Sequence, residues 1–134
     1  MIAKDLIAYD IPGISLNASL ESALNLMEEH KCRHLAVVDN EVYHGVISEN
    51  QIFDLEDHSE KISKAFSQLI KPAVRYNAHV YQVISVVNEF MITCVPVLDD
   101  KGKFIGVITL QNLALDFAKI TNVNEPGGIL ILEV

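Results

Sequence analysis

Several features are missing from the 134-residue sequence, and their absence excludes some classes of function before any motif is considered. No stretch approaches the roughly 18 consecutive apolar residues that a membrane-spanning helix needs. The opening "MIAKDLIAYD" holds acidic residues and no apolar signal-peptide core, so we expect a cytoplasmic protein with no membrane partner. Basic residues number 10 against 18 acidic ones. The net charge of −8 argues against nucleic acid as a partner, because phosphate binding needs a basic face.

Motifs for catalysis and for metal binding are also absent. No Walker loop, G-x-G-x-x-G motif or nucleophile–base set is present, which predicts that the chain is not an enzyme. His30, Cys32 and His34 alternate, but nothing completes the four ligands of a zinc site, so we expect no metal and no required cofactor. Cys32 and Cys94 lie in apolar surroundings and are expected to be buried and reduced.

What the sequence does contain is an internal repeat. Residues 14–39 align with residues 74–99 at an offset of 60, and one extra residue in the second copy then aligns "GVISENQI" with "GVITLQNL". The expected divisions are repeat one at 1–57, a linker at 58–65, repeat two at 66–121, and a hinge with an apolar strand at 122–134.

Each repeat predicts the element order β-α-β-β-α. Two apolar strands joined by a tight turn lie between helices whose apolar residues recur at i, i+3, i+4 and i+7. Asn17 or Ser19 is expected to cap the first helix. The long apolar strands predict an α/β (α+β) fold of small sheets packed together and flanked by helices. The helix residues expected to face inward are Leu20, Ala23, Leu24, Met27, Ile52, Leu55, Val80, Val83, Ile84, Val87, Leu110, Leu113, Ala114 and Phe117.

The repeated "GVIS" and "GVIT" ends carry two interpretations. Ser48 followed by Gln51 has the spacing of a capping box, and Thr109 followed by Asn112 is a weaker version of it. The same helix N-termini also favour a phosphate group, through their free N–H donors and positive dipole end. A glycine within each apolar strand, as in both copies of "GVI", often marks the close approach of a backbone or a ligand.

The stretches "HLAVVDNEVYHGVISENQI" and "CVPVLDDKGKFIGVITLQNL" together resemble a pair of CBS domains, the halves of a Bateman module. The resemblance covers the chain to about residue 121. It implies tandem repeats with pseudo-two-fold symmetry, whose clefts often hold AMP, ADP, ATP or S-adenosylmethionine. It also implies a regulatory, ligand-sensing role and a homodimer formed through the helices.

The resemblance also implies the ligand-binding residues. Ser48 and Thr109 stand where the family's hydroxyl contacts phosphate or ribose. Gln51 and Asn112 replace an aspartate that accepts bonds from the ribose hydroxyls, and each lost charge-assisted bond weakens binding by roughly 1 kcal/mol. The clefts are therefore weakly binding, empty, or specific for another adenosine compound. The alternative function is a structural dimerisation module with vestigial clefts.

One basic pair precedes the central strand of repeat one. Arg33 and His34 occupy positions where the resemblance implies phosphate contacts, whereas repeat two has Thr93 and Cys94 there. The alternative is a solvated strand start with a partly buried histidine. Successive strand residues point to opposite faces, so at most one of the pair faces a given cleft.

The chain ends with "EPGGILILEV", a turn followed by a strong strand former. An uncovered apolar strand is an aggregation hazard, so this segment either pairs with its own module or a partner, or begins a further domain. The chain resembles acetoin-utilisation-type CBS proteins, whose CBS pair is followed by an ACT-like domain. We therefore expect the start of a truncated ACT-like domain here.

Overall fold

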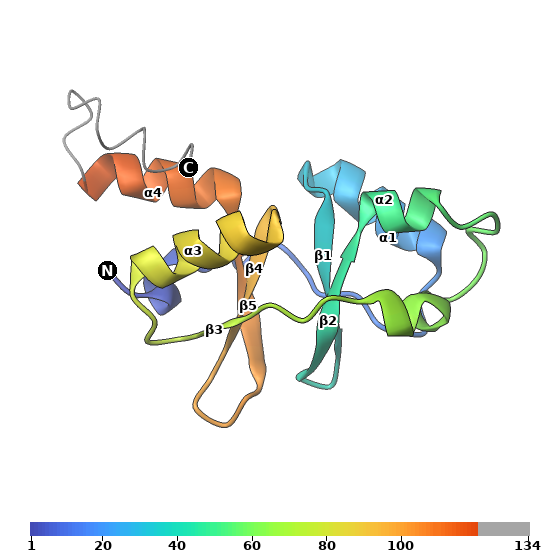
Figure 1. The fold of residues 1–134 in the computed structure, drawn as a ribbon, viewed down its shortest axis with the longest axis horizontal. Coiled ribbons are helices and arrows are strands. Elements are labelled where there is room, and N and C mark those ends of the chain that lie inside the picture. The colour runs from blue at the N-terminus through green and yellow to red at the C-terminus, as the bar shows by residue number, and fades with distance from the viewer. Residues whose placement is uncertain (121–134) are drawn as a thin grey trace.

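The computed structural model describes residues 1–120, and they form two similar halves side by side (Figure 1). A short 3-10 helix, η1 (Ala3–Leu6), precedes both halves. The elements of repeat one are α1 (Leu20–His30), β1 (His34–Asp39), β2 (Val42–Ser48), α2 (Glu49–Phe53) and the 3-10 helix η2 (Ile62–Gln68). The elements of repeat two are β3 (Val74–Arg75), α3 (Val80–Phe90), β4 (Cys94–Leu98), β5 (Phe104–Thr109) and α4 (Leu110–Ile120).

The two sheets confirm the internal repeat. Strands β1 and β2 pair antiparallel, as do β4 and β5, and β3 adds a parallel strand to β4. Val74 pairs with Val97 there, and repeat one has the equivalent pair as a single bridge between Ile14 and Val37, 60 residues earlier. The predicted α/β fold of small sheets flanked by helices is confirmed. Within residues 1–120, no helix is long and apolar enough to cross a membrane.

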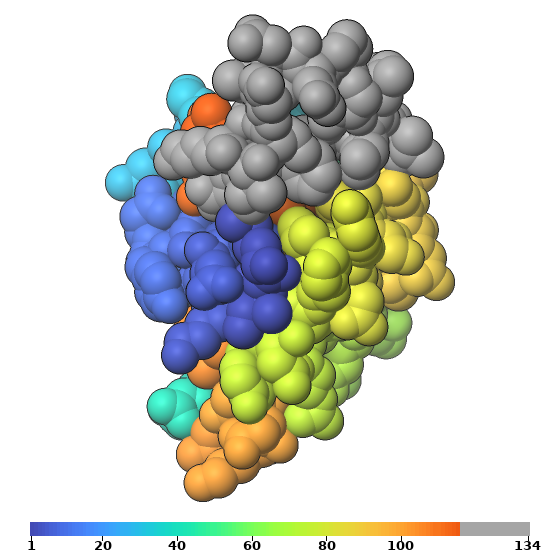
Figure 2. Space-filling view, turned by 90° about the vertical axis from the view of Figure 1, so that its left-hand side faces the viewer, coloured from blue at the N-terminus to red at the C-terminus, as the bar shows by residue number. Residues whose placement is uncertain are grey.

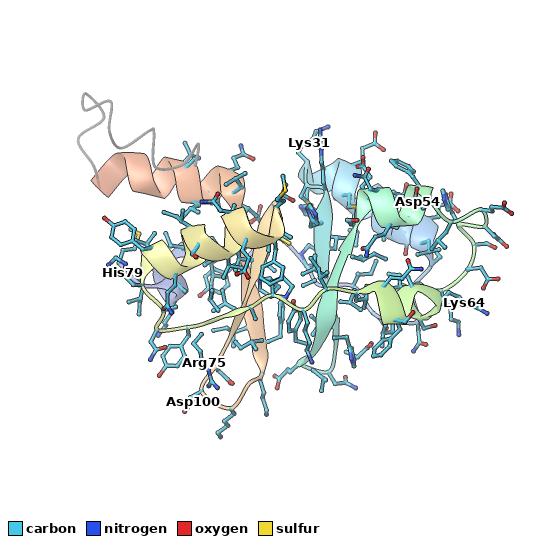
Figure 3. The ribbon with its side chains drawn as sticks, viewed as in Figure 1. Lys31, Asp54, Lys64, Arg75, His79 and Asp100 are labelled. Atoms are coloured by element: carbon cyan, nitrogen blue, oxygen red, sulfur yellow. The ribbon has the colours of Figure 1, made fainter. Side chains whose placement is uncertain are left out.

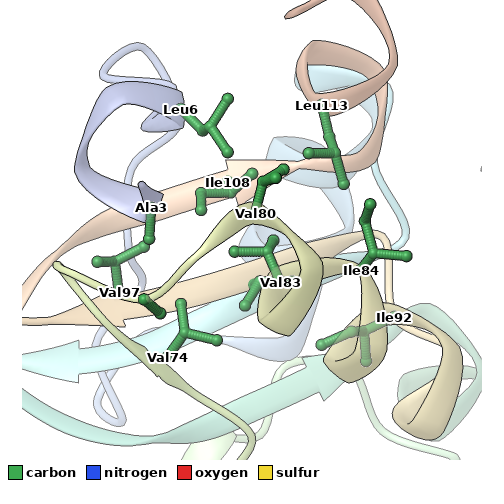
Figure 4. Packing of buried hydrophobic residues seen from close by; sticks show 12 residues of the cluster. Ala3, Leu6, Val74, Val80, Val83, Ile84, Ile92, Val97, Ile108 and Leu113 are labelled. Carbon is green, nitrogen blue, oxygen red and sulfur yellow. The ribbon is translucent and has the colours of Figure 1, made fainter. Parts of the chain in front are cut away.

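Most of the helix residues predicted to face inward lie in the core. Of the residues predicted to face inward, eight are buried: Leu20, Ala23, Met27, Ile52, Val80, Val83, Ile84 and Leu113. Figure 4 shows the last four of these in the core of repeat two. Ser19, not Asn17, caps α1, because its side chain accepts a hydrogen bond from the Ser22 N–H. The prediction for Leu110 is wrong: it begins α4 and is 37% exposed. The side chain of Phe117 lies outside the described residues, as does the expected ACT-like strand.

The N-terminal strap, residues 2–8, packs on repeat two rather than on the repeat that it precedes. The Ala3 N–H donates to the Ala78 carbonyl at 2.8 Å, and Ala8 forms an antiparallel bridge with Val107 of β5. Figure 2 shows this strap against the chain around the start of α3. Ala3 and Leu6 are buried in the core of repeat two (Figure 4).

The linker strap, residues 62–70, makes the reciprocal contact with repeat one. Ile62 and Ala65 are buried in the core of repeat one, and Ile70 bridges Val46 of β2. Each repeat thus borrows the segment that leads into the other. The predicted domain limits stay a prediction, but any division between the repeats has to cross these two straps.

Candidate functional site

The two copies of the repeated motif begin α2 and α4, and both act as helix caps. The Ser48 N–H donates to Gln51 Oε1 at 2.8 Å, and the Gln51 N–H donates back to Ser48 Oγ at 3.1 Å. In repeat two, the Asn112 N–H donates to Thr109 Oγ1 at 3.1 Å. The capping box at Ser48 and the cap at Thr109 are therefore confirmed.

In repeat one, the linker strap occupies the position beside this motif. Gln51 Nε2 donates to the Gln68 carbonyl at 2.7 Å, so both ends of the amide already have protein partners. Gly45 has a φ of +142°, and a Cβ there would lie 2.6 Å from the Ile70 carbonyl oxygen. The close approach predicted at this glycine is therefore that of the strap backbone.

In repeat two, a cleft of about 540 Å³ opens beside the motif, within the size range of ligand sites. It is lined by residues of both repeats and brings Thr109 and Asn112 together with the end of α1. Lys31, labelled in Figure 3, ends that helix with a φ of 56°. The residues that line it are Ala8, Asp10, Ile11, Glu29, His30, Lys31, Cys32, Thr93, Thr109, Leu110, Gln111, Asn112 and Ala114. Two of the predicted site residues, Thr109 and Asn112, thus share a cleft, whereas Ser48 and Gln51 lie at the start of α2.

His34 lies at the contact between the repeats. Its Nδ1 accepts the Thr93 N–H at 3.2 Å and lies 2.9 Å from Thr93 Oγ1. The Arg33 N–H donates to that same hydroxyl at 3.3 Å. Because a backbone N–H can only donate, Nδ1 is an acceptor and the proton of the neutral ring is on Nε2.

Burial shifts the pKa values of two side chains at this contact. It lowers the pKa of His34, and the neighbouring Arg33 charge lowers it further, against a smaller opposing effect of Glu49. Burial also raises the pKa of Cys94 to about 12. Both cysteines are free and buried, as predicted. Neutral groups are therefore favoured along this part of the contact between the repeats.

Arg33 and His34 diverge, as their alternation predicts. The exposed Arg33 side chain lines a second groove, of about 900 Å³, between α1 and α2, which it shares with Glu49 and Phe53. This groove is separate from the residues predicted for phosphate contact at α2. Among the side chains of residues 1–115, no cluster of three from histidine, cysteine and acidic residues is suited to hold a metal ion.

Sequence reasoning did not assign Lys31 to the cleft or His30 to a ligand role there. Both come from repeat one but line the cleft at the motif of repeat two. An offset alignment matches Lys31 with Met91, and so gives no sign of a basic group. The one signal available is that a lysine follows the first helix directly.

Comparisons with known proteins agree with this architecture. A homoserine O-acetyltransferase from Methanobrevibacter ruminantium is 27% identical over 117 residues, which cover 84% of this chain and 23% of the relative. The chain spans about a quarter of the length of the curated relatives it matches. A CBS domain pair/ACT domain protein from Thermotoga maritima superposes with a TM-score of 0.77 at 18% identity, covering 90% of this chain and 99% of that one.

A second solved structure, CBSX2 in complex with AMP, has a TM-score of 0.70 at 21% identity and covers 90% of this chain and 98% of that one. These two likenesses show the fold. The family model described as "CBS domain" matches residues 3–57 and again residues 67–118. The chain therefore belongs to the CBS domain family and carries two copies of the domain.

Proposed function

We propose that this CBS pair is a regulatory module that binds an adenosine nucleotide in the cleft beside Thr109. The observation that carries the proposal is the cleft itself, which joins the start of α4 to the basic end of α1. Its volume suits a nucleotide, and its residues come from both repeats. The AMP bound to the structurally similar CBSX2 supports the choice of ligand class.

The cleft offers a partner for each part of such a ligand. The Thr109 hydroxyl and the N-terminus of α4 would meet phosphate or ribose, and Lys31 would add a positive charge. Asn112 would accept a bond from a ribose hydroxyl, and apolar residues such as Ile11 would contact the base. Because Asp10 and Glu29 also line the cleft, a nucleotide with few negative charges fits best.

Repeat one would contribute a second, weaker site or none. The predicted ligand residues there are Ser48 and Gln51 at the start of α2, with Arg33 and His34 on the other side of the motif. Gln51 already donates to Gln68, and His34 already contacts Thr93. A ligand would have to displace these bonds, so we propose asymmetric binding with repeat two as the stronger site.

The module acts in this proposal as a homodimeric cytoplasmic sensor without catalytic activity of its own. Ligand in the cleft contacts both repeats, so it favours one packing of the repeats over another and transmits that preference to an attached or partner domain. The catalytic activities named for the longer relatives would belong to other parts of those chains, because the match covers about a quarter of their length.

A structural dimerisation module with vestigial clefts is the second candidate. The observation that favours it is the occupied amide of Gln51, which serves as a cap and a strap contact instead of a ligand contact. This alternative predicts that no nucleotide binds, whereas the proposed function predicts measurable binding in the cleft of repeat two.

Isothermal titration with AMP, ADP, ATP, S-adenosylmethionine and NADH tests the proposal. Thr109→Ala should weaken binding of the preferred nucleotide by about tenfold, since it removes a hydroxyl that would bond to a charged group. Asn112→Asp should tighten nucleotide binding by about tenfold, because a carboxylate accepts hydrogen bonds from ribose hydroxyls more strongly than an amide does. The control is Ser67→Ala, which removes an exposed hydroxyl outside the cleft. Absence of binding to any of the five compounds would reject the proposal and favour the structural module.

A further inference from the structure

His34 connects repeat one to the cleft of repeat two through a chain of hydrogen bonds. Its ring nitrogen Nδ1 accepts the Thr93 N–H at 3.2 Å, and the Thr93 carbonyl accepts the Leu110 N–H at 2.9 Å. Leu110 is the first residue of α4 and directly follows the Thr109 cap. Thr93, Thr109 and Leu110 all line the cleft. The ring of His34 is therefore two hydrogen bonds away from the helix end that would meet the nucleotide.

Repeat one has the equivalent backbone link but lacks the histidine. The Glu49 N–H, at the start of α2, donates to the Arg33 carbonyl at 2.9 Å, as the first residue of α4 does in repeat two. Cys94 occupies the position that corresponds to His34, and its thiol donates to the His34 carbonyl instead of accepting an N–H. An imidazole therefore supports the start of α4 and has no counterpart at the start of α2.

The link between His34 and Thr93 depends on the proton state of the ring. Nδ1 has to be unprotonated to accept the Thr93 N–H. Thr93 Oγ1 lies 2.9 Å from Nδ1 and also accepts the Arg33 N–H at 3.3 Å. A protonated Nδ1 can only donate, so it would leave the Thr93 N–H without its acceptor and opposite a second N–H. Protonation of His34 therefore loosens the hold of the ring on Thr93.

We propose that His34 is a positioning residue for the nucleotide cleft of repeat two. Its neutral ring holds Thr93 and the start of α4 in the arrangement that binds the nucleotide, and protonation of the ring releases them and weakens binding. This role rests on the nucleotide binding proposed above and adds a regulation of the same site by pH. By linkage, a bound nucleotide also makes the ring harder to protonate.

The groups around His34 set the pH range of this effect. Arg33 precedes it in the chain, Glu49 begins α2, and the Cys94 thiol of β4 contacts its carbonyl. Burial lowers the pKa of His34 from its ordinary value of 6.5, the Arg33 charge lowers it further, and Glu49 opposes this with a smaller effect. The ring is therefore neutral above about pH 6.5, and binding should weaken as the pH falls below that value.

Isothermal titration at pH 7.5 and 5.5, with the tightest-binding of AMP, ADP, ATP, S-adenosylmethionine and NADH, tests this role. His34→Ala removes the acceptor and should weaken binding by about fivefold at pH 7.5. His34→Asn supplies an amide oxygen that accepts an N–H without titrating, so at pH 7.5 its affinity should be within about twofold of wild type. Between pH 7.5 and 5.5, wild type should lose at least about twofold more affinity than His34→Asn.

The matched control is His44→Asn, which makes the same change on β2 at a histidine that pairs with Asp39. It should keep the pH profile of wild type, and far-UV circular dichroism at both pH values checks that each protein is folded. Parallel profiles of wild type and His34→Asn, or equal affinities of wild type and His34→Ala at pH 7.5, would overturn the role of His34 and leave nucleotide binding intact. Absence of binding by wild type at pH 7.5 would overturn the proposed function and this role together.

Discussion

At the scale of single residues, His34 lies at the contact between the repeats, although the family resemblance implied a phosphate contact for this side chain. Its ring accepts the Thr93 N–H through Nδ1, and the Cys94 thiol donates to the His34 carbonyl at 3.5 Å. A protonated ring would place a second N–H opposite the one from Thr93. The contact therefore requires a neutral imidazole.

This requirement predicts a pH dependence of stability. The pKa of His34 is lowered in the folded state, so the unfolded chain binds a proton below about pH 6.5 that the folded chain resists. The free energy of unfolding should therefore fall as the pH decreases from 7 to 5. In His34→Asn, whose side-chain oxygen can accept the same N–H without titrating, the decrease should be smaller.

Urea unfolding followed by far-UV circular dichroism at several pH values measures this difference. The other four histidines are common to both proteins, so their contributions cancel to first order. Parallel curves for wild type and His34→Asn between pH 7 and 5 would contradict the assignment of His34 as the neutral partner of Thr93.

At the scale of elements, the two straps explain features of the strands that otherwise suggest a ligand. Gly45 in β2 faces the Ile70 carbonyl of the linker strap, and Gly106 in β5 faces Ile7, which follows η1. In both strands the missing side chain makes room for protein. The glycine of "GVI" is therefore a packing requirement of the strap, and the ligand hypothesis has to rest on Thr109 and Asn112.

Gly45→Ala should destabilise the protein by more than about 2 kcal/mol, because its Cβ would lie 2.6 Å from the Ile70 carbonyl oxygen and φ is +142°. The matched control is Gly102→Ala. Its φ is +82°, but no atom lies within 4 Å of the added Cβ, so backbone strain alone should cost about 1 kcal/mol. Chemical denaturation measures both values, and equal losses would mean that the strap does not press on β2.

At the scale of the whole molecule, exchange of the straps couples the two repeats. Leu6 lies in the core of repeat two but is joined through the chain to repeat one, and Ile62 lies in the core of repeat one just before the chain crosses to repeat two. Neither core is complete without a segment that continues into the other half. We therefore expect the repeats to unfold together.

Leu6→Ala tests this coupling. It removes a fully buried side chain and should lower the free energy of unfolding by about 2–5 kcal/mol. The loss should shift one cooperative transition for the whole chain. Tyr9→Ala, at a site that is 77% exposed just beyond the same strap, is the control and should change stability little.

Because the sequence contains no tryptophan, far-UV circular dichroism and hydrogen exchange of amides in α1 and α3 are the suitable measurements. Equal loss of protection in both helices supports the coupling. Loss confined to α3, with α1 unchanged, would show that the repeats unfold separately.

The sequence by itself determined the repeat, the order of its α-helices and hairpin strands, and most of the helix residues that reach the core. Helices α1 and α3 and the two "GVI" strands were predictable because each has a regular apolar spacing. That spacing can be read directly from neighbouring residues in the sequence. The capping box of Ser48 and Gln51 was predictable for the same reason, since both partners lie within one helical turn. The prediction that Leu110 faces inward was wrong because the apolar pattern of α4 does not reveal which face of the helix the rest of the protein covers.

The tertiary structure alone decided how the candidate site is divided. The sequence treats Ser48 and Thr109 as equivalents, but the linker strap occupies Gln51 in repeat one, and the corresponding position in repeat two is open to a cleft. The basic end of α1 reaches that cleft from the opposite repeat. Lys31 and Thr109 are 78 residues apart, and a contact over that separation leaves no local pattern in the sequence. Only folding brings the two residues to one cleft.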